Sequence, residues 1–243
     1  HLEVKCTGES ADLLVSAMRT AWSRCLSTET PDGASDTPPV DAHLDDPSGL
    51  TQRLMLTTQE ITRALIGTQA GRLLMLHAGA VSHPETGASL VYVAPGGTGK
   101  TTLSQRLGRH LAYLTDETVG ITDAGGILPY PKPLSVRRVE GTGLKDEVSP
   151  DRLDLVPAPM APQVSRVVVL VRDQPPGVVH LEELTVMDAL FAVVEETSSL
   201  SSLARPLHRL AALLDAAGPV LRVRYGEASD VESELAGLIG GSA

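Results

Sequence analysis

One stretch of the chain decides the fold: Ala94-Pro95-Gly96-Gly97-Thr98-Gly99-Lys100-Thr101-Thr102. It follows an apolar segment that ends at Val93, and it precedes a helical pattern that contains Leu103 and Leu107. Strand, glycine-rich loop and helix in this order are typical of the phosphate-binding loop, whose pattern is G-x-x-x-x-G-K-[ST]. Ala94 stands where the pattern has its first glycine, which is tolerable if that position does not need a positive φ. The sequence therefore predicts a nucleotide-binding α/β protein.

The residue types in this loop fit the chemistry of a bound triphosphate. The glycines let backbone N–H groups wrap around a phosphate, and the helix that begins near Lys100 adds the positive end of its dipole. Lys100 supplies a point charge for the β- and γ-phosphates, and the Thr101 hydroxyl is a ligand for Mg²⁺. We therefore expect ATP and Mg²⁺ to bind residues 94–102. The alternative is a glycine turn that arose by chance.

A pair of acids follows the loop at a short distance. Tyr113-Leu114-Thr115-Asp116-Glu117 places the first carboxylate 16 residues after Lys100, directly after one helix. One acid of such a pair would hold Mg²⁺, and the other would accept a proton from a hydroxyl nucleophile. The alternative is an exposed acidic turn.

Composition excludes several other classes of protein. The chain has 243 residues, of which 42% are hydrophobic and 2% aromatic, and its net charge is −10. A nucleic-acid partner is not expected, because such proteins carry a basic face or aromatic platforms. The longest apolar run, Val167–Val171, is too short to cross a bilayer, so we expect no membrane partner and a cytoplasmic location. Cys6 and Cys25 form no CxxC pair and are expected in the core.

Hydrophobic periodicity predicts the remaining elements. Residues 28–49 form an acidic, proline-rich segment and residues 140–163 another proline-containing segment, and both are expected to be loops. Trp22 and Cys25 are expected on the buried face of a helix. Strands are expected at 2–6, 50–56, 73–81, 90–93, 111–114, 119–121, 167–171 and 220–225, and helices at 10–26, 57–70, 185–195, 198–217 and 229–238. Hairpins alternate with strand–helix units in this order, which predicts a mixed sheet.

The motifs together resemble a known family. Leu76-His77-Ala78-Gly79-Ala80-Val81, then a hairpin, then the phosphate loop, then Leu114-Thr115-Asp116-Glu117, resembles the catalytic domain of HPr kinase/phosphorylase. The likeness is closer still to the smaller HPr-kinase-like proteins of peptide-modification clusters, and Pro131-Lys132-Pro133-Leu134-Ser135 matches a segment often found in them. The resemblance covers about residues 70–140. It implies an α/β P-loop kinase of the phosphoenolpyruvate-carboxykinase/HPr-kinase type, with a mixed sheet that contains a hairpin.

The resemblance also implies a domain layout and roles for the two acids and for His77. Residues 1–243 would form one catalytic domain, with an N-terminal part over 1–56, a nucleotide-binding core over 70–140 and a C-terminal part over 164–243. Glu117 would be the general base and Asp116 would lie nearer the metal, together with Thr101. The family has aspartate as well as glutamate at the second acid, and the glutamate side chain is one methylene longer. The reverse assignment, with Asp116 as the base and Glu117 nearer the metal, therefore stays open. His77 would lie beside the phosphates, with a packed core histidine as the alternative.

Two further residues are candidate contacts to the substrate. Lys132 is a candidate for touching substrate or phosphate. Arg172, at the end of a buried strand, is a candidate for supplying charge to the transferring phosphoryl group, with a surface arginine as the alternative.

The predicted function is transfer of the ATP γ-phosphate to a hydroxyl, on Ser or Thr of a peptide or protein or on a small molecule. The glycine-rich signature that follows the acids in HPr kinases is missing here, which argues against HPr itself as the acceptor. A non-kinase P-loop NTPase and a nucleotide-sensing binding module are the alternatives. The acceptor, the choice of ATP over GTP and the oligomeric state stay open.

Overall fold

The computed structural model describes residues 1–27, 37–138 and 143–240. Contacts divide the chain into two compact units, one formed by His1–Gln69 and Lys132–Leu153 and the other by Ala70–Pro131 and Asp154–Ala243. Sequence analysis predicts one domain, and its nucleotide-binding core falls within the second unit up to Pro131. The predicted loop over 28–49 lies outside the described residues from 28 to 36.

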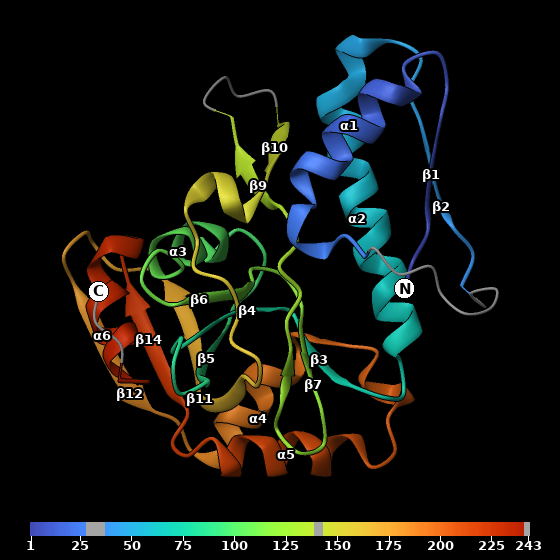
Figure 1. The fold of residues 1–243 in the computed structure, drawn as a ribbon. Helices are drawn as coiled ribbons and strands as arrows, with labels where there is room; N and C mark the ends of the chain where they lie inside the picture. The colour runs from blue at the N-terminus through green and yellow to red at the C-terminus, as the bar shows by residue number, and fades with distance from the viewer. Residues whose placement is uncertain (28–36, 139–142, 241–243) are drawn as a thin grey trace. The chain divides into compact units, whose positions relative to one another are not determined.

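The first unit combines helices with two small sheets. A parallel pair of strands is flanked by two helices, and an antiparallel hairpin follows later in the chain (Figure 1). Its elements are β1 (Val4–Thr7), α1 (Ala11–Ala21), η1 (Ser23–Cys25), β2 (Val40–His43), η2 (Pro47–Gly49), α2 (Leu50–Gln69), β9 (Leu134–Arg137), β10 (Lys145–Val148) and η3 (Pro150–Leu153). Strands β2 and β10 lie in segments that sequence analysis expects to be loops.

Two further sequence predictions in this unit are wrong. The strand predicted at 50–56 is the first part of α2, because the 3₁₀ turn η2 precedes it, with the Asp46 side chain accepting from the Ser48 N–H at 2.9 Å. The buried residues of α2 recur at helical spacing: Thr57, Thr58, Ile61 and Thr62. Cys25 is exposed because α1 ends at Ala21 and the 3₁₀ turn η1 breaks the helical period; Trp22 is buried as predicted.

The second unit contains a mixed six-stranded sheet, which confirms the predicted mixed α/β architecture with its hairpin. Its order is β12-β14-β11-β5-β4-β6, in which β5, β11 and β14 are parallel while β4 runs antiparallel to β5 and to β6. A second, four-stranded sheet has the order β13-β3-β7-β8. The strands are β3 (Leu74–Leu76), β4 (Ala78–Ser82), β5 (Ala88–Val93), β6 (Ala112–Thr115), β7 (Val119–Ile121), β8 (Ile127–Leu128), β11 (Gln163–Arg172), β12 (Val179–Glu183), β13 (Thr197–Ser198) and β14 (Leu221–Tyr225).

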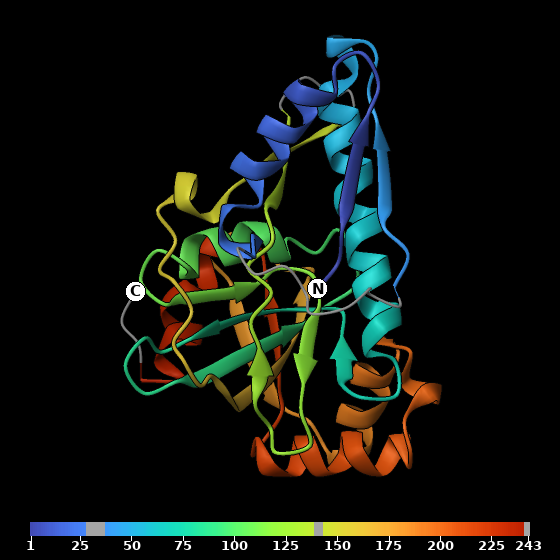
Figure 2. The same ribbon diagram turned by 45° about the vertical axis from the view of Figure 1, so that its right-hand side comes forward.

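Helices cover both faces of the six-stranded sheet. On one face α3 (Lys100–Leu107) and α6 (Ala228–Gly237) pack Leu103, Leu107 and Leu235 against Tyr92 and Val168. On the other face α4 (Val186–Val194) and α5 (Pro206–Ala216) pack on alternate residues of the same strands (Figure 1), and Figure 2 shows these two helices across the sheet from α3. Successive side chains of the central strands point to opposite faces of the sheet, so each strand contributes to two separate hydrophobic cores.

The single strand predicted at 73–81 is in fact two strands that belong to different sheets. The break falls at His77, whose N–H donates to the Glu196 carbonyl at 2.6 Å, while the next N–H, that of Ala78, donates to the Glu117 carbonyl at 3.1 Å. A continuous apolar run does not show such a break, because both strands are buried. The helix predicted at 198–217 begins only at Pro206, after η4 (Leu200–Ser202).

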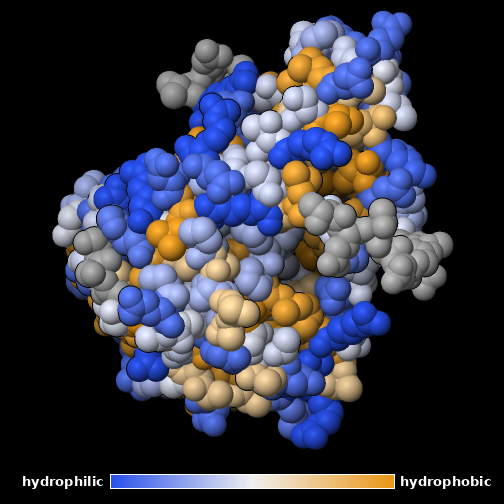
Figure 3. Space-filling model, in the orientation of Figure 1, coloured by the Kyte–Doolittle hydropathy of each residue, from blue (hydrophilic) through white to orange (hydrophobic). Residues whose placement is uncertain are grey.

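Hydrophilic residues cover much of the face shown in Figure 3, with apolar residues between them. Throughout the described ranges, the structure contains no helix long and apolar enough to span a membrane.

Candidate nucleotide-binding site

The phosphate loop joins β5 to α3, as the sequence predicts. Gly97 and Gly99 have φ values of 87° and 104°, which is backbone that glycine adopts readily. Ala94 is buried and is not one of the residues with positive φ, so the missing glycine of the motif costs nothing here. A Cβ built at Gly96 or Gly97 would meet no atom within 4 Å, so an anion can approach the loop closely. The backbone thus fits a phosphate group.

Lys100, the first residue of α3, is only 6% exposed. Its Nζ donates to the carbonyl oxygens of Ala94 and, at 3.1 Å, of Pro95, and it lies 3.1 Å from Nε2 of His77. Burial lowers the pKa of Lys100, and nearby acids, first among them Glu196, partly offset that effect. The cation is therefore held at the loop.

Asp116 follows edge strand β6 and is 4% exposed. The Thr101 hydroxyl donates to its Oδ2 at 2.8 Å, and the Tyr113 hydroxyl donates to its Oδ1 at 3.1 Å. A hydroxyl and a carboxylate are the hard oxygen ligands that Mg²⁺ prefers. The donor set at Thr101 and Asp116 therefore fits the predicted metal.

This donor set is small, which also suits magnesium. Over the parts of the chain that the structure describes, no group of three or more His, Cys, Asp or Glu side chains could hold a metal ion by itself. Magnesium is usually bound by one or two protein oxygens together with substrate phosphates, rather than by an all-protein cage. Thr101 and Asp116 therefore suit a magnesium ion that binds together with a nucleotide.

Glu117 and His77 lie together beside Lys100. The Glu117 carboxylate is close enough to both to raise their pKa values. Burial, followed by the charge of Lys100, lowers the pKa of His77 below its usual value. These effects favour the neutral form of His77, in which an unprotonated Nε2 can accept a hydrogen bond from the lysine.

Glu196 is a further candidate site residue, which the sequence motifs do not identify. It follows α4, and its charge is the first of those that raise the pKa of Lys100. Antiparallel pairing of β13 with β3 brings it to the loop, since Thr197 lies opposite Leu76. The sequence offers only Glu195-Glu196 after an apolar helix, which is not a specific signal.

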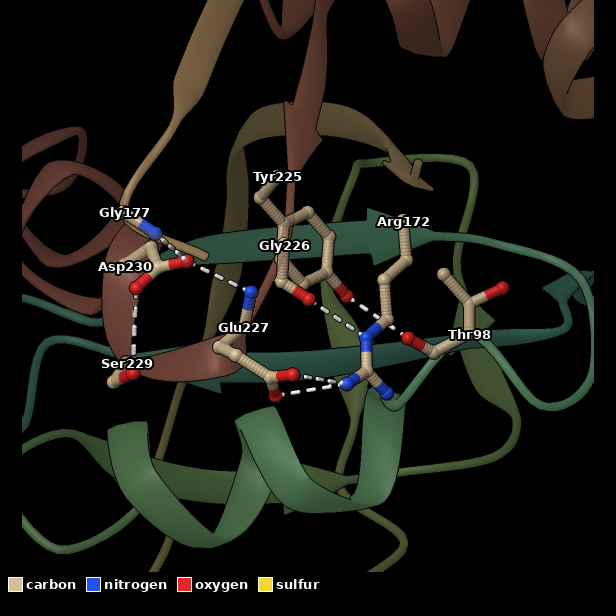
Figure 4. Close-up of polar contacts among 8 residues, drawn as sticks. All are labelled: Thr98, Arg172, Gly177, Tyr225, Gly226, Glu227, Ser229 and Asp230. Atoms are coloured by element: carbon tan, nitrogen blue, oxygen red, sulfur yellow. Dashed lines mark hydrogen bonds and ion pairs between the residues drawn. The ribbon is translucent and has the colours of Figure 1, made fainter. Parts of the chain in front are cut away.

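Arg172 is the last residue of β11, which lies on the opposite side of β5 from β6 and Asp116 in the sheet. Its Nε donates to the Gly226 carbonyl and its Nη2 to both carboxylate oxygens of Glu227, each at 2.8 Å (Figure 4). A Cβ built at Gly99 would lie 3.9 Å from Arg172 Nη1, which places the guanidinium beside the phosphate loop. The Tyr225 hydroxyl donates to the loop itself, at the Thr98 carbonyl, 3.0 Å away.

Tyr225 and Glu227 are candidate site residues that the sequence motifs do not identify. The signal was indirect: strands β5, β11 and β14 are parallel neighbours, so their carboxyl ends meet at one edge, where ligands bind in open α/β sheets. Lys132, by contrast, belongs to the first compact unit, whereas the other candidate residues belong to the second. It is 1% exposed, and its Nζ donates to the Pro133 carbonyl at 3.0 Å.

Comparison with solved structures finds several chains with a similar fold. The HPr(Ser) kinase/phosphatase from Coxiella burnetii matches 63% of this chain and 79% of its own, with 14% identity and a TM-score of 0.28. It comes from the family that the sequence motifs resemble. No protein-family model matches the chain. No curated protein matches it either.

Proposed function

We propose that this protein transfers the γ-phosphate of ATP to a hydroxyl group of an acceptor. One observation carries the proposal: two adjacent acids meet the phosphate loop, and they have different surroundings. Asp116 accepts hydrogen bonds from Thr101 and Tyr113, whereas Glu117 lies close to His77 and Lys100. Sensing of a nucleotide needs no base, whereas attack by a hydroxyl nucleophile uses a metal-orienting acid together with a group that accepts the nucleophile's proton.

The residues divide into those that hold the nucleotide and those that act on the acceptor. The backbone N–H groups of residues 96–99 and the Lys100 ammonium would bind the phosphates. Thr101 and Asp116 would hold Mg²⁺, which neutralises charge on the phosphate oxygens when it is bound. His77 would contact the same phosphates, with its neutral ring beside Lys100.

Glu117 would act as the general base. The acceptor hydroxyl gives its proton to the Glu117 carboxylate as its oxygen bonds to the γ-phosphorus. The bond from that phosphorus to the bridging oxygen breaks at the same time, and ADP leaves with the electron pair. Arg172, beside Gly99, would stabilise negative charge on the phosphate oxygens during transfer.

The acceptor belongs to one of two classes, a Ser or Thr hydroxyl of a peptide or protein, or a small-molecule hydroxyl. The test measures ADP release from Mg·ATP with and without fractions of a cell extract that separate metabolites from peptides, with Lys100→Ala as the blank. Turnover that depends on one fraction supports the phosphotransferase, and radiolabelled γ-phosphate then identifies the product.

Two other results would contradict the proposal. ADP release at full rate in every fraction, with all label recovered as inorganic phosphate, indicates an NTPase. Tight Mg·ATP binding without release in any fraction indicates a nucleotide-sensing module.

A further inference from the structure

Two side chains between the end of β14 and the start of α6 connect to the phosphate loop, and the proposed chemistry does not use them. Tyr225 ends β14, and Glu227 directly precedes α6. One reaches the loop by a hydrogen bond to Thr98, the other through Arg172 (Figure 4). We propose that Tyr225 and Glu227 are positioning residues for bound phosphate, Tyr225 acting through the Gly99 amide and Glu227 through Arg172. This inference rests on the proposed nucleotide site.

The contact of Tyr225 sets the direction of a loop amide. Its hydroxyl donates to the Thr98 carbonyl at 3.0 Å, and that carbonyl belongs to the same planar peptide unit as the Gly99 N–H. The two groups point in opposite directions in a trans peptide, and no described peptide bond is cis. The hydrogen bond to Tyr225 therefore holds the Gly99 N–H pointing away from β14. Gly99, with a φ of 104°, has the freedom to turn this peptide if the bond is lost.

The Tyr225 hydroxyl keeps its proton for this role. Burial raises the pKa of Tyr225, so the phenol stays neutral and remains a donor across the physiological range. A phenylalanine at this position would keep the ring in its core, which also contains Val223 and Val231, and would lose only the donor.

The contacts of Arg172 leave one corner of its guanidinium for the loop. Nε and Nη2 are occupied by Gly226 and Glu227. Among the residues that the structure describes, no hydrogen bond is recorded for Nη1, the nitrogen that lies 3.9 Å from a Cβ built at Gly99. Two corners of the planar fork are thus fixed, and the third faces the loop. Such an arrangement holds a donor ready for a phosphate oxygen.

The segment that carries Glu227 is itself fixed. Oδ2 of Asp230 accepts from the Glu227 N–H at 2.8 Å and from the Gly177 N–H at 3.0 Å (Figure 4). A Cβ at Gly226 would lie 2.5 Å from the Pro175 carbonyl oxygen, so the chain passes close to the turn that follows β11. Side chains of the Arg172–Glu227 pair are 43% and 51% exposed, and exposed pairs add little to stability. We therefore infer that the ion pair orients Arg172 rather than stabilising the fold.

The test compares binding of three probes by calorimetry: Mg·ATP, inorganic pyrophosphate and adenosine. We expect Tyr225→Phe to weaken Mg·ATP and pyrophosphate roughly three- to tenfold, the worth of one hydrogen bond, and to leave adenosine unchanged. We expect Glu227→Gln to weaken the same two probes about two- to fivefold. A merely structural role would not separate pyrophosphate from adenosine.

A matched control comes from the neighbouring strand pair. Glu182→Gln removes the same charge from another exposed ion pair, Arg222–Glu182 at 3.0 Å, between β14 and β12. We expect it to bind all three probes like the wild type.

A double-mutant cycle checks that Glu227 acts through Arg172. In an Arg172→Ala background, Glu227→Gln is expected to have no further effect on pyrophosphate binding. An equal effect in both backgrounds would overturn the role of Glu227.

The two proposals fail in different ways. If Lys100→Ala binds Mg·ATP as well as the wild type does, the nucleotide site itself is wrong. If Lys100→Ala loses binding while Tyr225→Phe and Glu227→Gln match Glu182→Gln, only the inference about positioning is overturned. A lower Tm in Tyr225→Phe with unchanged pyrophosphate affinity would overturn it as well.

Discussion

The two sides of the phosphate loop differ in how they reach it. On the β6 side, Asp116 arrives 16 residues after Lys100, through one helix and one strand. On the β11–β14 side, Arg172 and Tyr225 arrive from segments 73 and 126 residues beyond Gly99. The first side carries groups of a sequence motif, and the second carries groups that only the parallel pairing of three strands brings together. The β6 side is recognisable from the sequence because its residues are close together in the chain. The β11–β14 side is not, because its residues are far apart in the chain.

The largest effect is expected at Lys100, because the groups on both sides lie around its loop. Lys100→Ala removes the cation that the loop carbonyls hold, so nucleotide binding and turnover fall together. We expect a loss of about a thousandfold or more in kcat/KM, because an electrostatic donor and ground-state binding are both removed. Steady-state kinetics measures it, with Lys145→Ala as the control for loss of a lysine. A near-normal kcat/KM in Lys100→Ala would show that the loop takes no part in the reaction.

On the β6 side, Glu117→Gln separates chemistry from binding. We expect kcat to fall about 10²- to 10⁴-fold, the usual worth of a general base, while the Kd for Mg·ATP stays the same. Glu234→Gln, an exposed glutamate on α6, is the matched control. If Asp116→Asn keeps metal-dependent ATP binding and Glu117→Gln loses it, the two acids have the reverse roles.

Substitution of Gly79 tests how tightly β4 packs against β5, the strand that leads into the loop. A Cβ at Gly79 would meet the ring of Tyr92, on β5, at 2.0 Å, and the hydroxyl of that tyrosine pairs with Ser104 on α3 at 2.5 Å. We expect Gly79→Ala to lower the free energy of unfolding by about 1–3 kcal/mol, the cost of overpacking. Gly67→Ala, in α2 with open space around it, should instead raise stability by about 0.5–1 kcal/mol. Denaturant titration compares the two, and equal stability of both variants would contradict this packing.

The smallest effect is a pH dependence of stability from His77. Burial and the Lys100 charge lower the pKa of His77 below 6.5 in the folded protein, so the folded state binds this proton less readily than the unfolded chain. Its contribution to stability is therefore complete above pH 6.5 and is lost as the pH falls toward the lowered pKa. Between pH 7.5 and 5.5 the wild type should lose more Tm than His77→Gln does. His208→Gln, at an exposed histidine, should keep the wild-type slope.

Sequence reasoning succeeded where structure is local and failed where it depends on partners. The order β5, loop, α3, β6 and Asp116-Glu117 followed from short-range signals and is confirmed. The start of α2 at Leu50 was missed because a segment of seven residues, four of them apolar, suits a strand or a helix equally well without its tertiary neighbours. Glu196 and Tyr225 were missed because strand pairing with distant segments, β3 and β11, places them.

The break at His77 has a consequence for insertions and deletions. Leu76 is in register with Val119 in one sheet and Ala78 with Val93 in the other, so a single residue separates two locked strands. Adding or removing one residue there would force a strand to slip, and a slip by one turns every side chain of that strand to the opposite face. Most turns of a protein tolerate changes in length. We expect this junction to tolerate none, so that a library of single-codon insertions yields no folded variants at this position.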